Sequence, residues 1–326
     1  MLQMRQMYQI CWASHEEVMF RKEQDINYIF NCFAFGCLST ESRAVGDSEM
    51  TTHCHFGVCS DDPHELFNVM RYPYTRYFDN EYGRRGSIGE RKPYIMQVDG
   101  LYHMQTFCSY VFRQSLHHGL TMTPFGYKHN SVNAIFQKEL GKCPPPDLLE
   151  RRYMYKYLPR SFRDVPSGYR MSSNGLLLRE DVIDTAYVEE LYISPRNFLY
   201  QMNRKDSMEW KKEQEADRNG LPPVTLENVE PACFRQMMPQ FLNNDNSRSY
   251  RHDIDDLEMC GLIDNLYLPR TGHKSIYELT QSEKNDLANS LYNCIRNGEM
   301  TRLLGRNPGL PDKAQISRCL ALKYDR

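Results

Sequence analysis

The sequence lacks the features of membrane-spanning and secreted proteins. Its 326 residues contain no run of about 18 apolar side chains, the length that a membrane helix requires. The first twenty residues include Arg5, Glu16 and Glu17, whereas a secretory signal has a continuous apolar core. Because neither feature is indicated, we expect a cytoplasmic protein that does not contact a membrane.

The cysteines lack the spacing of a disulfide framework or a zinc finger. There are 11 of them, scattered from Cys11 to Cys319, and no C-x-x-C pair occurs. An odd number without paired spacing favours reduced thiols. The composition is otherwise that of a globular protein, with 25% charged residues and a net charge of −2, which disfavours a uniformly basic nucleic-acid coat.

Acidic residues are missing from one long segment. No Asp or Glu occurs from residue 100 to residue 138, and the net charge changes from −6 over residues 1–65 to +5 over residues 66–138. Basic side chains among His, Tyr and Phe are typical of a surface that binds phosphates and stacks on bases. The alternative is a solvated helix face, which many charge runs form.

The patterning of the first half predicts alternating strands and helices. Aromatic and β-branched residues predict strands over 27–37, 49–59 and 94–98. Apolar residues at helical spacing predict a helix that opens at Asp62 and Pro63 and ends near Gly83, and a second helix over 101–118. The expected class is therefore α+β.

Three consecutive prolines at 144–146 cannot continue a helix or a central strand. They predict a first domain of residues 1–142, a linker of residues 143–175 and a mainly helical domain of residues 176–326. The helices expected in the second half are 181–191, 195–202, 207–218, 226–242 and 282–296, the last with Thr280 and Glu283 spaced as a capping box.

Two histidines stand two residues apart in a strand-like segment. Alternate side chains of a strand share one face, so His53 and His55 can present two imidazoles to one metal ion, while Cys54 points to the opposite face. The alternative is a pair of histidines that only form hydrogen bonds. On the helix predicted over 101–118, Tyr110 and Gln114 are four residues apart, so a phenol and an amide share a face.

Three segments in this order resemble the single-tyrosine transposases of the HUH endonuclease superfamily, especially the REP-associated tyrosine transposases. The segments are MTTHCHFGV, MRYPYTRYFDNEYGRRGSIGE and VDGLYHMQTFCSYVFRQSLHHGL, and the resemblance covers residues 5–140. The family has an M-P-N-H-x-H strand, a helix with Y-x-R-x-F-N, a G-x-(L/I)-(F/W) turn and a helix that ends in Y-I-x-x-N-P-V-x-x-G. Thr51 and Thr52 replace the Pro-Asn of the first motif, and Gly89 replaces an aromatic residue of the turn.

The resemblance implies a role for each matching residue. Tyr110 matches the nucleophilic tyrosine, His53 and His55 match two metal-binding histidines, and Gln114 matches the third, amide-bearing ligand. Imidazoles with an amide and water suit Mg²⁺ or Mn²⁺ better than zinc. The basic residues that the resemblance allows to contact the DNA backbone are Arg71, Arg76, Arg84, Arg85 and Lys92.

The fold and activity implied are those of the family. We expect a ferredoxin-like antiparallel sheet, with the histidines on a central strand and flanking helices, followed by a mainly helical domain. The expected activity is metal-dependent cleavage and strand transfer of single-stranded or hairpin DNA, in which Tyr110 forms a 5′-phosphotyrosine; a homodimer is possible. A phosphotyrosine stores the energy of the broken bond, so rejoining needs no ATP.

Two competing hypotheses remain open at the level of sequence. One is a non-catalytic DNA-binding regulator derived from a transposase, and the other is an unrelated metal-dependent hydrolase that does not use Tyr110. The C-terminal segment LPDKAQISRCLAL resembles the first helix of a helix-turn-helix, and the alternative is a plain packing helix.

Overall fold

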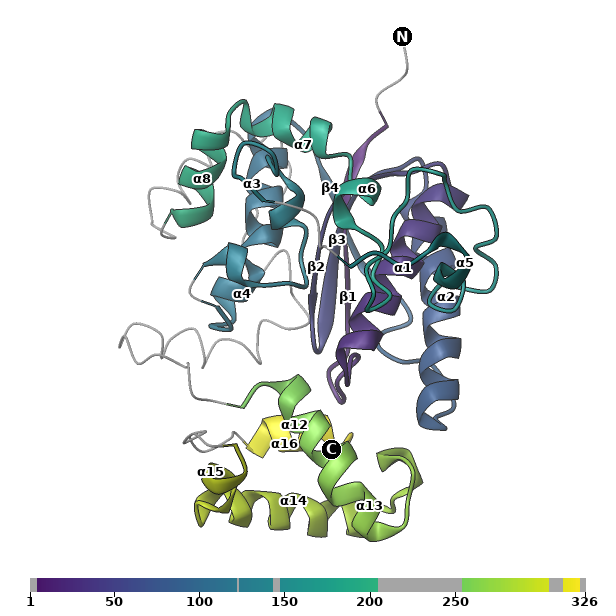
Figure 1. The fold of residues 1–326 in the computed structure, drawn as a ribbon, viewed down its shortest axis with the longest axis vertical. Helices are drawn as coiled ribbons and strands as arrows, with labels where there is room; N and C mark the ends of the chain where they lie inside the picture. The colour runs from purple at the N-terminus through teal and green to yellow at the C-terminus, as the bar shows by residue number, and fades with distance from the viewer. Residues whose placement is uncertain (1–4, 122, 143–146, 205–253, 305–312, 323–326) are drawn as a thin grey trace.

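The computed structural model describes residues 5–121, 123–142, 147–204, 254–304 and 313–322 (Figure 1). A four-stranded antiparallel sheet lies between two layers of helices, and a further group of helices lies below them in the view of Figure 1. The class is therefore α+β, as predicted.

The sheet has the order β2-β3-β1-β4, and every neighbouring pair is antiparallel. Its strands are β1 (Met7–Ala13), β2 (Arg43–Met50), β3 (His53–Cys59) and β4 (Tyr94–Val98). Strand β3, which carries both histidines of the H-x-H segment, is central and buried along its whole length. Helices cover both faces of a central strand, so its side chains are shielded from water on either side.

Two long helices, α1 (Glu23–Ser39) and α2 (Pro63–Tyr82), cover one face of the sheet (Figure 1). Phe33 of α1 stacks on Phe56 of β3, with ring centroids 4.4 Å apart. The opposite face is covered by α3 (Leu101–Phe112) and α4 (Gln114–His117). The remaining elements of this part are α5 (Arg151–Met154), α6 (Arg179–Val182), α7 (Thr185–Tyr192) and α8 (Pro195–Asn203), with 3₁₀ turns at Pro124–Gly126 and Val132–Ala134.

The predicted strand over 27–37 is wrong, because these residues lie within helix α1. The helix is buried on most of its circumference, so its apolar residues do not form the narrow stripe of a surface helix. A continuous apolar run of this kind cannot be distinguished from a buried strand by periodicity alone. The helix begins where the Asp25 carboxylate accepts the backbone N–H of Arg21 (2.8 Å) and of Lys22 (3.1 Å).

The other element predictions for the first half are mostly confirmed. The strand over 94–98 is β4, and the helix from Asp62 to Gly83 is α2, with Asp62 as its N-cap and Gly83 in the left-handed conformation after its last turn. The segment 49–59 is a hairpin, with Thr51 and Thr52 as the turn between β2 and β3. The helix over 101–118 is interrupted at Arg113, between α3 and α4.

The main hydrophobic core continues past the prolines. Met154, Leu158, Phe162, Val165 and Met171 are buried in the same cluster as the sheet and helices α1 to α3. The side chains of α7 and α8 also belong to this cluster. Residues between 147 and 175 that were predicted to form a linker are therefore packed against the body, while the proposed division into domains stays a prediction.

The C-terminal helices form a second hydrophobic cluster. They are α12 (Asp256–Leu262), α13 (Leu268–Thr271), α14 (Gln281–Arg296), α15 (Glu299–Leu304) and α16 (Lys313–Cys319), with a π-helical turn at Ile263–Tyr267 and a 3₁₀ turn at Ile276–Glu278. The capping box of Thr280 and Glu283 is confirmed at the start of α14. In α16, Ile316 and Cys319 are buried in the cluster, which favours a packing helix.

This group of helices is attached to the body by buried polar contacts. The guanidinium of Arg21, 2% exposed, donates to both oxygens of Asp264 (3.0 and 2.6 Å). The Thr51 hydroxyl in the turn before His53 donates to Asp256 (2.6 Å). The second group therefore contacts the hairpin that carries the two histidines.

Two predicted helices, 207–218 and 226–242, lie outside the described residues. The helix predicted over 195–202 is α8, and the one over 181–191 is divided between α6 and α7. None of the described helices combines the length and apolarity needed to cross a membrane. No disulfide joins any two of the nine cysteines in the described ranges.

Candidate active site

The two histidines of β3 share one face of the sheet, as their spacing predicts. Their ring centroids are 5.3 Å apart and the rings are nearly perpendicular. The His55 Nδ1 atom lies 3.0 Å from Nε2 of Gln9 on the neighbouring strand β1, and the His53 Nδ1 atom lies 3.1 Å from the Thr52 hydroxyl. These contacts at Nδ1 help to orient both rings.

Helix α3 brings Tyr110 to the histidines because two glycines permit a close approach. A Cβ at Gly57 of β3 would lie 2.8 Å from the ring of Phe107, and one at Gly46 of β2 would lie 3.0 Å from the ring of Phe112. Any larger residue would therefore push α3 away from the sheet. The Tyr110 ring lies edge-on to His55, with centroids 6.1 Å apart.

The break at Arg113 turns the chain so that α4 joins the same cluster. His117 stacks on Tyr110 with centroids 5.2 Å apart, and His118 lies 5.0 Å from His53. Gln114 is one turn before His118, whose N–H donates to the Gln114 carbonyl (3.0 Å). Within the described part of the chain, the Gln114 side-chain Oε1 and Nε2 atoms are buried without a hydrogen-bond partner.

Of the four predicted site residues, His53, His55 and Tyr110 lie within this cluster, and Gln114 is buried on α4. The members of the cluster that were not predicted are Gln9, His117 and His118. A signal for the two additional histidines exists in the sequence, since they follow Tyr110 by two turns of a helical segment. Gln9 carries no such signal, because strand pairing alone brings it to His55.

Most of the cluster is buried, and His118 is partly exposed. His53, His55, Tyr110 and Gln114 are at most 3% exposed, and His117 is 8% exposed. Burying polar groups costs free energy unless a partner satisfies them, so the amide of Gln114 is an unusual occupant of this position. The two amide atoms are the groups that the Gln114 side chain could offer to a ligand.

The donor set fits a hard or borderline divalent cation. Among the described residues, no group of three or more His, Cys, Asp or Glu side chains is arranged to hold a metal ion, so a site here depends on the Gln114 amide oxygen as the third ligand. Oxygen and imidazole donors suit Mg²⁺ or Mn²⁺. A Gln9 amide turned with its oxygen toward Nδ1 would fix the tautomer in which the His55 Nε2 atom binds metal.

The predicted DNA-contacting residues differ in how available they are. Arg76, Arg85 and Lys92 are exposed, and Arg71 is half-buried with its guanidinium 4.8 Å from the Tyr72 ring centroid. Arg84 is instead paired with Glu17 and Asp79, and its guanidinium also lies over the ring of Tyr277. The structure thus gives Arg84 a part in the attachment of the C-terminal helices.

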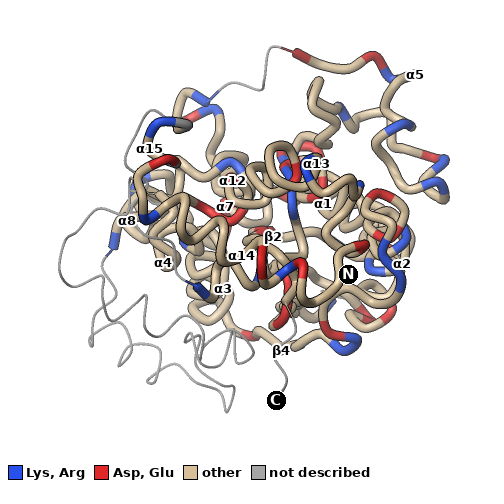
Figure 2. Tube along the Cα trace, turned by 90° about the horizontal axis from the view of Figure 1, so that it is seen from below, with Lys and Arg blue, Asp and Glu red and all other residues tan. Residues whose placement is uncertain are grey.

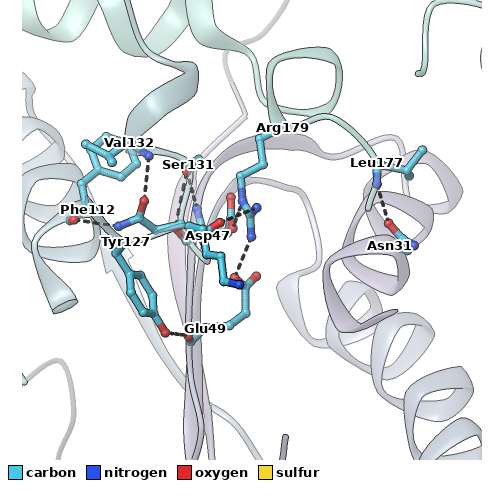
Figure 3. A network of polar contacts seen from close by, with 11 residues as sticks. Asn31, Asp47, Glu49, Phe112, Tyr127, Ser131, Val132, Leu177 and Arg179 are labelled. Carbon is cyan, nitrogen blue, oxygen red and sulfur yellow. Dashed lines mark hydrogen bonds and ion pairs between the residues drawn. The ribbon is translucent and has the colours of Figure 1, made fainter. Parts of the chain in front are cut away.

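A second buried polar cluster lies on the other face of strand β2, because Asp47 and Glu49 pair in register with Phe56 and Cys54, which alternate with the histidines. Figure 3 shows this cluster. Arg179 of α6 donates to Asp47 (2.7 Å) and to Glu49 (2.9 Å), and both carboxylates are fully buried. Burial and the neighbouring Asp47 raise the pKa of Glu49 well above its usual value, against the influence of Arg179. The raised pKa favours the uncharged form of Glu49 within this cluster.

Comparisons with known proteins found a structural similarity but no match at the level of sequence. No family model matches the sequence, and no curated protein matches it. A solved structure described as a REP-associated tyrosine transposase bound to a REP hairpin is similar over 43% of this chain and 82% of that chain, with 9% identity and a TM-score of 0.35. The assignment of the site therefore depends on the geometry of its own residues.

Proposed function

We propose that the protein is a metal-dependent single-stranded DNA endonuclease and strand transferase of the transposase type, with Tyr110 as its nucleophile. The observation that carries this proposal is that helix α3 brings the Tyr110 ring to His55, whose ring lies 5.3 Å from that of His53, while the Gln114 amide at the start of α4 is buried without a hydrogen-bond partner among the described residues. A phenol beside two imidazoles supplies a nucleophile and two metal-ligand types, and the Gln114 amide oxygen would supply a third ligand for phosphotyrosine chemistry.

The architecture supports the same proposal. The first six elements follow the order β-α-β-β-α-β of the ferredoxin-like motif, with the histidines on a central strand. Helix α3 follows this motif and lies on the face to which the histidines point. We therefore propose an HUH endonuclease domain followed by a helical extension.

The proposed reaction assigns a task to each residue. Tyr110 Oη attacks the phosphorus of a backbone phosphodiester, the bond from phosphorus to the 3′ oxygen breaks, and the 5′ phosphate remains on the tyrosine. The phenol proton is lost to solvent or a neighbouring base, and the departing 3′ oxygen takes up a proton. His117, stacked on the Tyr110 ring, orients the phenol.

His53, His55 and Gln114 would hold the metal ion, which supplies positive charge to a non-bridging phosphate oxygen when bound. Gln9 would hold the His55 ring in the metal-binding orientation. Arg71, Arg76, Arg85 and Lys92 would contact the DNA backbone and position the strand without reading its sequence.

Formation of a covalent adduct tests the proposal. The full-length protein is incubated with a labelled single-stranded hairpin DNA and Mn²⁺ or Mg²⁺, with and without EDTA, and adducts are separated on a denaturing gel and mapped by mass spectrometry. We expect a metal-dependent adduct at Tyr110 that Tyr110→Phe abolishes. Tyr102→Phe on the same helix is the matched control and should retain the adduct.

The burial of Tyr110, which is 3% exposed, favours a second candidate function, a DNA-binding regulator without catalysis. DNA binding with no adduct across a panel of hairpins would support this candidate. Metal-dependent DNA hydrolysis that persists in Tyr110→Phe without any adduct would instead indicate a metal-dependent hydrolase.

A further inference from the structure

A second candidate binding site lies on the other face of the sheet from Tyr110. A cavity of about 650 Å³ is formed by α1, α2 and the segment that follows α5. Its volume is within the range of pockets that hold small ligands. In Figure 1 this segment lies beside α1 and α2, on the side of the molecule away from α3 and α4.

The cavity carries an excess of positive charge. Arg76, Lys156, Arg160 and Arg163 line it and are exposed, and no carboxylate among the described residues forms an ion pair with any of them. The acidic residue of the lining is Glu81, which is paired with Lys22. Figure 2 shows that basic residues lie both along α2 and near α5. Such a concentration of unpaired cations favours a ligand with phosphate groups.

Aromatic side chains form a wall of the same cavity. Tyr28 of α1 stacks on Tyr77 of α2, with ring centroids 4.1 Å apart and planes inclined by 18°. The Tyr77 hydroxyl donates to the buried carboxylate of Asp25 (2.9 Å), which fixes the pair in place. A rigid aromatic surface is able to take up the flat face of a base at little entropic cost.

Another wall of the cavity is formed by the segment that follows α5, which is hydrogen-bonded to α1. Asn31 Nδ2 donates to the carbonyls of Tyr157 (2.9 Å) and Gly175 (2.8 Å), and Asn27 Nδ2 donates to the carbonyl of Asn174 (3.1 Å). Gly175 has φ +83°, and a Cβ there would lie 2.3 Å from the Tyr157 ring. These contacts hold the segment at a fixed distance from α1, so the cavity is a formed feature of the fold.

We propose that this cavity binds a nucleotide, with its phosphate on the basic side chains and its base against the Tyr28–Tyr77 stack. Phosphate alone would not require the aromatic wall, and an apolar ligand would not require four cations. The nucleotide is either one unit of a single-stranded DNA or a free nucleotide. The inference does not depend on the proposed chemistry at Tyr110.

The test measures binding without metal, so that strand cleavage does not contribute. Full-length protein in EDTA is titrated against a fluorescently labelled (dT)₁₂ by anisotropy over a range of salt concentrations, and dTMP is added as a competitor. The pocket variants are Arg160→Ala with Arg163→Ala, and separately Tyr28→Ala. The control variant, Arg152→Ala with Arg196→Ala, removes the same charge from exposed positions outside the cavity.

We expect the double pocket variant to weaken binding about tenfold and to reduce the salt dependence by about 0.7 for each lost phosphate contact. Tyr28→Ala should weaken binding with an unchanged salt dependence, because stacking releases no counterions. Competition by dTMP would identify a free nucleotide, and its absence would identify a unit of the DNA chain. Pocket variants that bind both ligands as tightly as the control variant would overturn the proposal.

Discussion

Two buried polar clusters lie on opposite sides of the β2–β3 hairpin, and they satisfy their polar groups in different ways. On one side, Asp47 and Glu49 are paired with Arg179. On the other side, Gln114 of α4 is fully buried, and both polar atoms of its side chain are without a hydrogen-bond partner among the described residues. In the first cluster each carboxylate has one oxygen bound to Arg179, while Asp47 Oδ1 and Glu49 Oε1 have no hydrogen-bond partner among the described residues. We interpret the first cluster as structural and the second as a candidate ligand site.

The electrostatics of the first cluster explain how it is tolerated. A buried arginine needs a buried anion, and Asp47 and Glu49 accept hydrogen bonds from the Arg179 guanidinium at 2.7 and 2.9 Å. The Arg179 guanidinium also lies 4.6 Å from the ring centroid of Phe30 on α1, and Arg179 donates to the Lys128 carbonyl. This cluster thus ties the segment after residue 147 to the sheet.

The largest loss of stability is expected when Arg179 is replaced. Arg179→Met leaves a buried carboxylate without its counter-charge, which should cost about 3–5 kcal/mol of unfolding free energy, measured by urea denaturation. Arg43, at the start of the same strand β2, forms an exposed ion pair with Asp184. Arg43→Met should therefore lower the free energy of unfolding by less than about 1 kcal/mol. Equal costs for the two variants would contradict a structural role for the buried cluster.

His129 should make the stability of the protein depend on pH, with an effect of intermediate size. Its backbone carbonyl accepts the N–H of Glu49. Burial and the nearby Arg179 and Lys128 lower the pKa of His129 to about 3. The unfolded chain therefore binds a proton that the folded protein does not, and stability falls as the pH drops below about 6.5 toward 3. At pH 5 the loss should be about 2 kcal/mol.

His129→Asn should flatten this acid-side loss, as measured by urea denaturation between pH 7 and pH 4. The exposed His64 is the matched control, and His64→Asn should leave the pH profile unchanged. A wild-type profile retained by His129→Asn would show that other groups produce the acid sensitivity.

The same two clusters mark the limit of prediction from sequence. The shared face of His53 and His55 follows from the alternation of side chains in a strand, which depends only on local geometry. The proximity of Tyr110 and Gln114 to that face came from a family resemblance, and its cause is the close approach of α3 at Gly46 and Gly57. The Arg179 pairs join residues 130 and 132 positions apart, which no local pattern indicates.

The error in helix α1 has a related cause. Its residues are covered by the sheet, by α2 and by the segment after 147, so the polar face that identifies a surface helix is missing. Conversely, the strand and helix that were predicted correctly, β4 and α2, have clear ends, such as the Asp62–Pro63 start and the Gly83 stop. Local capping chemistry is readable from sequence, whereas burial by distant segments is not.

The smallest change in stability is expected when Gln114 is replaced. This change also distinguishes the two clusters most sharply. Gln114→Leu removes an unsatisfied amide, so it should leave the metal-free protein as stable as wild type or stabilise it by about 1 kcal/mol. Gln105→Leu on α3, which loses a hydrogen bond to the Leu191 carbonyl, should destabilise the protein by about 1 kcal/mol.

Mn²⁺ at ten times its Kd should stabilise the wild type by about 1.4 kcal/mol and Gln114→Leu much less, as measured by thermal denaturation. If Gln114→Leu destabilised the metal-free protein as strongly as Arg179→Met, Gln114 would be a structural residue, and the two sides of the hairpin would not differ in purpose.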